Sequence, residues 1–132
     1  ILLAMGSMTG TLKDAVDSLR TEGEKVGLVK IRSFRPFPYE EICQAVKRAK
    51  AVAVVDANLS LGSEGAISMD LKAKLYGLPD APQILNVIAG LGGRDVNEAR
   101  IKEIINKVNE AKTSGYCLQE PYWCGLNPSI VP

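Results

Sequence analysis

The stretch Ala51–Ala57 (AVAVVDA) decides the fold. All of its residues except Asp56 are apolar, and they do not alternate with polar residues. An unbroken apolar run of this length is typical of a strand that is covered on both faces, as in a parallel sheet. The stretch therefore predicts the central strand of a sheet that has helices on both sides.

The same alternation of elements extends from this stretch in both directions. Further strands are expected at residues 1–5, 26–34 and 83–89. Apolar residues recur at helical spacing within residues 12–19, 42–49, 67–75 and 101–108. This order predicts an α/β three-layer sandwich with a mostly parallel sheet over residues 1–112. Residues 113–132 are expected to form a tail that packs on the domain or on a neighbouring subunit.

Composition excludes several classes of function. The 132 residues carry a formal net charge of +1, which gives no reason to expect nucleic acid or a membrane as partner. The chain has no histidine, and its three cysteines fit no metal-binding spacing. We therefore expect no catalytic, cofactor-binding or metal-binding residue here, and sparse cysteines favour a cytoplasmic protein.

The four strand-to-helix loops are expected to share one edge of the sheet, because crossovers between parallel strands are right-handed. Ligands of open α/β sheets usually bind at that edge. The loops are MGSMTG, SFRPFP, DANLSLGSEG and AGLGGRD.

The glycine-rich loop Gly90–Asp95 matches neither nucleotide-binding fingerprint. It lacks the third glycine of G-x-G-x-x-G, and no GK[ST] follows it. Asp95 is expected to cap the following helix, with Glu98 completing a capping box. The loop is then either a tight strand–helix turn or a glycine corner that another protein surface approaches, with Arg94 presented outward. The two interpretations are compatible.

The loop after the central strand is a weak candidate for an anion site. Its candidate residues are Ser60, Gly62, Ser63 and Gly65. Glu64 counts against anion binding, and an ordinary solvated loop is the alternative. Asp56 is interpreted as a carboxylate bonded to this loop in preference to a catalytic one.

Two further groups of side chains have a binding and a structural interpretation. Arg32 and Arg35 flank a corner that also contains Pro36, and they could bind a phosphate or a partner carboxylate. Ion pairs are the favoured alternative. Tyr122 and Trp123 are interpreted as packing anchors, since no basic stripe accompanies them.

Three motifs, in this order and spacing, resemble a known family. They are KIRSFRPFPYEEI, VAVVDANLSLGSEGAI and NVIAGLGGRDV. Residues 1–112 resemble the C-terminal transketolase-like domain of the α subunit of pyruvate:ferredoxin oxidoreductase and related 2-oxoacid:ferredoxin oxidoreductases. GLGGRDV is the most specific part, and PYWCGLN in the tail is similar to the Trp-Gly-Leu ending of such subunits.

The resemblance implies a whole enzyme that converts a 2-oxoacid and CoA to an acyl-CoA and CO2, using thiamine diphosphate, Mg and iron–sulfur clusters to reduce ferredoxin. It implies that this chain is a non-catalytic assembly domain without those cofactors, part of a longer polypeptide or complex. The expected interface residues are Arg35, Pro36, Phe37, Gly92, Gly93, Arg94 and Asp95. The alternative is a stand-alone α/β module that binds a small anionic ligand at the loop edge of its sheet.

Overall fold

The computed structural model describes residues 1–115, 119–127 and 129, and its centre is a five-stranded sheet. The strand order is β2-β1-β3-β4-β5, and every neighbouring pair runs parallel. The strands are β1 (Leu2–Met5), β2 (Leu28–Ile31), β3 (Ala51–Asp56), β4 (Gln83–Ile88) and β5 (Tyr122–Trp123). The described strands therefore include no antiparallel one.

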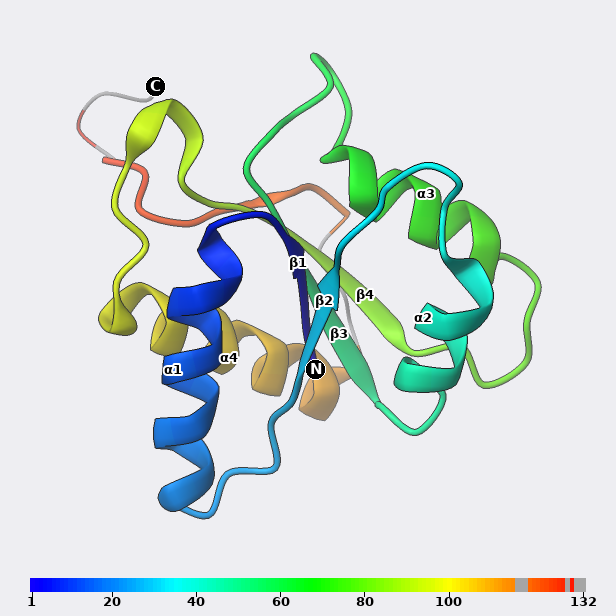
Figure 1. Ribbon diagram of the computed structural model, residues 1–132, viewed down its shortest axis with the longest axis horizontal. Helices are drawn as coiled ribbons and strands as arrows, with labels where there is room; N and C mark the ends of the chain where they lie inside the picture. Colours follow the sequence, from blue (N-terminus) through cyan, green and yellow to red (C-terminus); the bar gives the residue numbers. More distant parts are fainter. Residues whose placement is uncertain (116–118, 128, 130–132) are drawn as a thin grey trace.

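Four α-helices cover the two faces of the sheet (Figure 1). One face carries α1 (Met8–Thr21) and α4 (Glu98–Ser114). The other carries α2 (Tyr39–Val46) and α3 (Ala66–Leu75). A short 3-10 turn, η1 (Leu91–Gly93), lies between β4 and α4. The predicted three-layer α/β sandwich is confirmed.

The position of β3 between two helical layers explains why its sequence is apolar without alternation. All six of its residues are buried. Ala51, Ala53 and Val55 face the core that contains α1 and α4, whereas Val52 and Val54 face the core that contains α2 and α3. Because successive side chains of a strand point to opposite faces, a strand between two helical layers needs apolar residues at every position.

The tail returns to the sheet and supplies its last strand. In β5, Tyr122 pairs with Val87 and Trp123 pairs with Ile88. The amide of Cys124 then donates a hydrogen bond of 2.9 Å to the Ile88 carbonyl. The exposed edge of β4 is thus covered by residues far along the chain.

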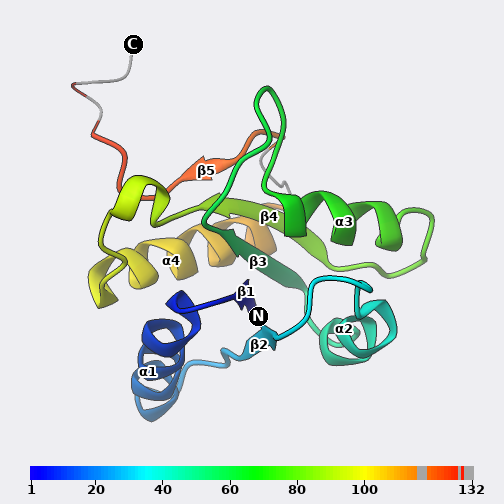
Figure 2. The same cartoon turned by 45° about the horizontal axis from the view of Figure 1, so that its top comes forward.

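The loops that follow β1, β2, β3 and β4 gather at the carboxyl edge of the sheet, as parallel strands require. The loop after β3 projects furthest from the sheet in the turned view (Figure 2). Among the described residues, no helix has both the length and the apolar character needed to span a membrane.

Candidate functional site

The carboxylate of Asp56 lies at the carboxyl end of β3 and is 1% exposed. Its Oδ1 accepts a hydrogen bond from the Ile67 amide at 3.2 Å, and its Oδ2 accepts one from the Ser68 amide at 3.2 Å. Both donors belong to the first turn of α3, where backbone amides lack partners within the helix. Asp56 therefore caps a helix that begins ten residues further along the chain.

The neighbouring strand contributes the partner of this carboxylate. Asn86 of β4 is buried, and its Nδ2 donates a hydrogen bond of 3.2 Å to Oδ2 of Asp56. Its Oδ1 accepts a hydrogen bond of 3.1 Å from the Gly65 amide. Asn86 was not among the predicted site residues, although a polar side chain within the otherwise apolar stretch ILNVI indicates a buried amide that needs partners.

Burial raises the pKa of Asp56, and the hydrogen bonds from Ile67, Ser68 and Asn86 oppose that shift. Three donors from its own chain surround the carboxylate. The sequence predicted a carboxylate bonded to the following loop, whereas these donors to Asp56 lie in the first turn of α3 and in β4.

Glycine is required at position 65 because the backbone there touches Asp56. A Cβ at this position would lie well under 3.0 Å from the Cβ, Cγ and Oδ2 atoms of Asp56. The amide of Gly65 is already bonded to Asn86. Gly65 is therefore buried against Asp56, whereas Ser60, Gly62 and Ser63 are exposed at the tip of the loop. The structure does not bring the four anion-site candidates to one point.

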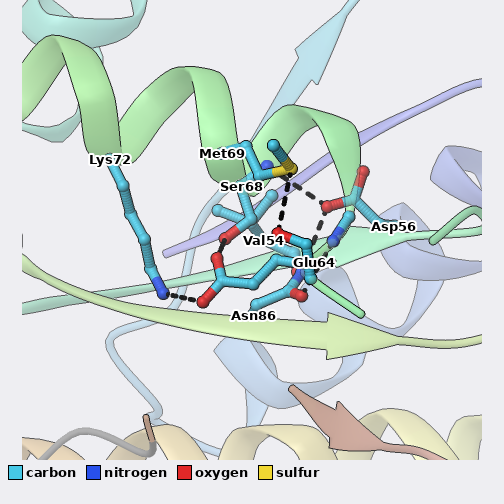
Figure 3. Close-up of polar contacts among 9 residues, drawn as sticks. Val54, Asp56, Glu64, Ser68, Met69, Lys72 and Asn86 are labelled. Atoms are coloured by element: carbon cyan, nitrogen blue, oxygen red, sulfur yellow. Dashed lines mark hydrogen bonds and ion pairs between the residues drawn. The ribbon is translucent and has the colours of Figure 1, made fainter. Parts of the chain in front are cut away.

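Glu64 connects the same loop to the body of α3. Its carboxylate accepts a hydrogen bond of 3.1 Å from the Ser68 hydroxyl and forms an ion pair with Lys72 (Figure 3). The negative charge is thus paired within the chain and fixes the base of the loop.

The glycine-rich loop after β4 turns through three left-handed residues. Gly90, Gly92 and Gly93 have φ values of 72°, 69° and 78°. L-residues with side chains rarely adopt this conformation, which accounts for the three glycines. The loop is a tight turn, as one of the two interpretations expected.

The predicted cap at Asp95 is wrong. The N-cap of α4 is Asn97, whose side chain accepts a hydrogen bond of 3.1 Å from the Arg100 amide. Val96 packs against the core beside α1 and α4, and the chain is extended at Arg94 and at Asn97. Placing Val96 in the core delays the start of the helix by two residues beyond the expected cap, so Asp95 and Glu98 form no capping box.

Arg94 reaches the tail of its own chain. Its Nη1 donates a hydrogen bond of 3.0 Å to the carbonyl of Gly125. The β4–α4 loop and the tail together line a pocket of about 350 Å³ that is open to solvent. It is lined by Ile88, Leu91, Gly92, Arg94, Trp123, Cys124 and Leu126.

A second contact fastens the tail to α4. The hydroxyl of Tyr122 donates a hydrogen bond to Glu103, which also pairs with Arg100 at 3.0 Å. Burial, followed by the Glu103 contact, raises the pKa of Tyr122, and the Tyr122 hydrogen bond is the main cause of a lowered pKa at Glu103. Burial also raises the pKa of the Cys124 thiol. Among the described residues, neither Cys43 nor Cys124 forms a disulfide. Cys117 lies outside the described residues.

The remaining interface candidates lie on the loop between β2 and α2. The guanidinium of Arg35 pairs with Asp70 of α3 at 2.7 Å and lies 3.9 Å from the centre of the Phe34 ring. Phe34 in turn meets Phe37 edge to face, with ring centres 5.9 Å apart. Because β1 and β3 separate β2 from β4, Arg35, Pro36 and Phe37 form one group and Gly92–Asp95 form another.

Residues 1–104 match a family model described as pyruvate:ferredoxin oxidoreductase core domain II. The chain belongs to this family. It is 42% identical over 123 residues to a pyruvate synthase subunit PorA of Methanosarcina barkeri, covering 92% of this chain and 31% of that protein. It is 44% identical over 126 residues to a ketoisovalerate oxidoreductase subunit VorA of Pyrococcus furiosus, covering 96% and 32%.

A pyruvate synthase subunit PorA of Pyrococcus abyssi is 40% identical over 131 residues, which is 99% of this chain and 33% of that protein. The chain thus spans about a third of the length of the curated relatives that it matches. The match to core domain II ends within α4, whereas the similarity to PorA also includes the tail that forms β5.

Proposed function

We propose that this chain is the non-catalytic structural and assembly domain of a thiamine-diphosphate-dependent 2-oxoacid:ferredoxin oxidoreductase. The whole enzyme would convert a 2-oxoacid such as pyruvate, together with CoA, to an acyl-CoA and CO2, and would reduce ferredoxin in the cytoplasm. Membership of the core domain II family and similarity to PorA and VorA subunits over nearly the whole chain support the proposal.

The polar groups at the carboxyl edge have partners within the chain, which supports a structural role for this edge. Asp56, the most buried carboxylate there, is surrounded by donors from its own chain, and Glu64 is paired with Lys72. Within residues 1–115, 119–127 and 129, no group of three or more Cys, Asp or Glu side chains is arranged to hold a metal ion. The residues at this edge do not fit a diphosphate–metal site, and we assign them no step of the reaction.

Two loops would carry the contacts with other domains and subunits. The first presents Arg35, Pro36 and Phe37, and the second presents Gly92, Gly93, Arg94 and Asp95. Exposed apolar side chains beside the second loop, at Leu91, Trp123 and Leu126, favour contact with another protein surface. The alternative of a stand-alone anion-binding module has less support, because the Gly65 amide is already bonded to Asn86.

Calorimetric titration of the 132-residue chain with thiamine diphosphate and Mg²⁺ tests the non-catalytic role. We expect no saturable heat, whereas a subunit complex that contains the full-length chain should bind the cofactor. Saturable binding by the isolated chain would contradict the proposal. A complex that binds the cofactor but does not reduce ferredoxin with any 2-oxoacid would contradict the assigned reaction.

A further inference from the structure

The pocket between the β4–α4 loop and the tail gathers apolar residues from two segments that are far apart in the sequence. Leu91 belongs to η1, whereas Trp123 and Leu126 belong to the tail. These three residues are 39%, 37% and 36% exposed. Single exposed apolar residues are common on soluble proteins, but several around one hollow indicate a binding surface.

The walls of this pocket are held by hydrogen bonds within the chain. Arg94 donates to the Gly125 carbonyl at 3.0 Å, which joins the loop to the tail. The Cys124 amide donates to the Ile88 carbonyl at 2.9 Å, which joins the tail to the sheet. The hydroxyl of Tyr122 is bonded to α4. A pocket that is already formed loses little conformational entropy when it is filled.

Arg94 gives the pocket a positive charge that the described residues leave without an acidic partner. A guanidinium has five N–H donors, and the Gly125 carbonyl accepts from Nη1 alone. Arg94 forms no ion pair with any residue that the structure describes. The described residues of the lining include no Asp or Glu, and residues 116–118, 128 and 130–132 have no charged side chain.

The lining therefore defines the chemistry of the occupant. Arginine binds a carboxylate through two parallel N–H···O hydrogen bonds. The apolar residues around Arg94 require an apolar group beside that carboxylate. At about 350 Å³ the pocket lies near the lower end of the roughly 300–1,000 Å³ of small-molecule pockets. An Asp or Glu side chain together with an adjacent apolar side chain meets all of these requirements.

The size of the pocket favours an occupant from the same polypeptide over one from a separate subunit. Seven described residues line it, whereas a stable interface between separate chains has roughly 20–30 residues on each side. A small contact is sufficient within one polypeptide, because a covalent link gives an effective concentration of about millimolar. The matched regions cover 31–33% of the relatives' lengths, so about two thirds of each relative lies on the same polypeptide outside this domain.

We propose that another domain of the same polypeptide inserts an acidic side chain and a neighbouring apolar side chain into this pocket, with the carboxylate on Arg94. This inference rests on the proposed function. It names the partner of the loop that contains Gly92, Gly93, Arg94 and Asp95.

Crosslinking in the assembled oxidoreductase, with the full-length form of this chain, identifies the occupant. A photoreactive amino acid replaces Leu126, which lines the pocket. The matched control position is Tyr76, which is 90% exposed just past the far end of α3. We expect position 126, but not position 76, to crosslink within a single polypeptide to a segment that has Asp or Glu beside an apolar residue. Crosslinks to another subunit, or only within residues 1–132, overturn the inference.

Charge reversal then tests the contact with Arg94. Arg94→Glu should speed hydrogen exchange of the amides of residues 91–93 in the full-length subunit about tenfold, because two carboxylates would then meet. Arg48→Glu is the control, since Arg48 is an exposed arginine between α2 and β3. It should leave that exchange unchanged. Replacing the crosslinked acid by arginine should restore slow exchange to Arg94→Glu. Failure of this second change to restore it overturns the assigned pair.

The outcomes also distinguish this inference from the proposed function. A complex that reduces ferredoxin with a 2-oxoacid, and in which position 126 crosslinks to no acidic segment of its own polypeptide, overturns the inference alone. A complex that reduces ferredoxin with no 2-oxoacid overturns the proposed function and the inference that rests on it.

Discussion

Substituting Gly65 by alanine should destabilise the fold more than any other single methyl group added at a glycine of this chain. The new Cβ would lie well under 3.0 Å from the Cβ, Cγ and Oδ2 atoms of Asp56. A contact with the Cβ of Asp56 cannot be relieved by rotating the carboxylate, so the strand or the loop must shift. Either shift stretches the hydrogen bonds from Ile67 and Ser68 to the carboxylate.

The expected cost follows from those two hydrogen bonds. Hydrogen bonds to a charged group contribute about 1.5–3 kcal/mol each, and overpacking of a core costs typically about 1–3 kcal/mol. Because the strand and the loop can relax in part, the total cost should be smaller than the sum of these contributions. We therefore expect Gly65→Ala to lower the free energy of unfolding by about 3 kcal/mol and the melting temperature by roughly 10 °C.

Urea unfolding of the 132-residue chain, monitored by far-ultraviolet circular dichroism, measures this cost. The control is Gly10→Ala, because Gly10 lies in α1 and an added Cβ meets no atom within 4 Å. The control should raise the free energy of unfolding by about 0.5 kcal/mol, since alanine favours a helix over glycine. A Gly65→Ala midpoint equal to that of the wild type would refute the proposed contact with Asp56.

Three further predictions concern single side chains. Asp56→Asn should lower the free energy of unfolding by about 2 kcal/mol at neutral pH, because the amide supplies one acceptor where two oxygens now accept hydrogen bonds. Burial raises the pKa of Asp56, so the folded state holds its proton more tightly than the unfolded state. The stability advantage of the wild type over Asp56→Asn should therefore shrink as the pH rises from 3.8, the ordinary pKa of aspartate, through the raised pKa of Asp56. Urea midpoints of both proteins, measured across this pH range, test the prediction. Tyr122→Phe should cost about 1 kcal/mol by calorimetric melting, because Glu103 loses one donor and keeps only Arg100; an unchanged melting temperature would contradict the Tyr122 contact. Arg94→Ala should change the melting temperature of the chain by only a few degrees, because the Gly125 contact is exposed, yet weaken subunit assembly in sedimentation; full assembly would remove Arg94 from the interface.

The fold could be predicted because its main determinant is local in sequence. Residues 51–55 are apolar at every position, which a strand requires only when both of its faces are covered. Helical periodicity on either side then fixes the alternation of strands and helices. The sheet order and the parallel direction of β5 were not predictable in this way, because two residues of strand carry too weak a pattern.

The site was predicted less completely because its contacts join residues far apart in the chain. Asn86 and Gly65 are 21 residues apart, and Arg94 and Gly125 are 31 residues apart. The error at Asp95 has a different cause. A capping box was expected from local spacing, but packing of Val96 against the core moved the cap to Asn97.

In the whole oxidoreductase, the carboxyl-edge loops of this domain should be buried against its other parts. Hydrogen exchange of backbone amides, compared between the 132-residue chain and the full-length subunit in its complex, tests it most directly. We predict slower exchange in the complex for residues 33–37 and 91–95, with little change in the exposed turn at 76–79. Equal exchange of the two loops in both forms would contradict the account.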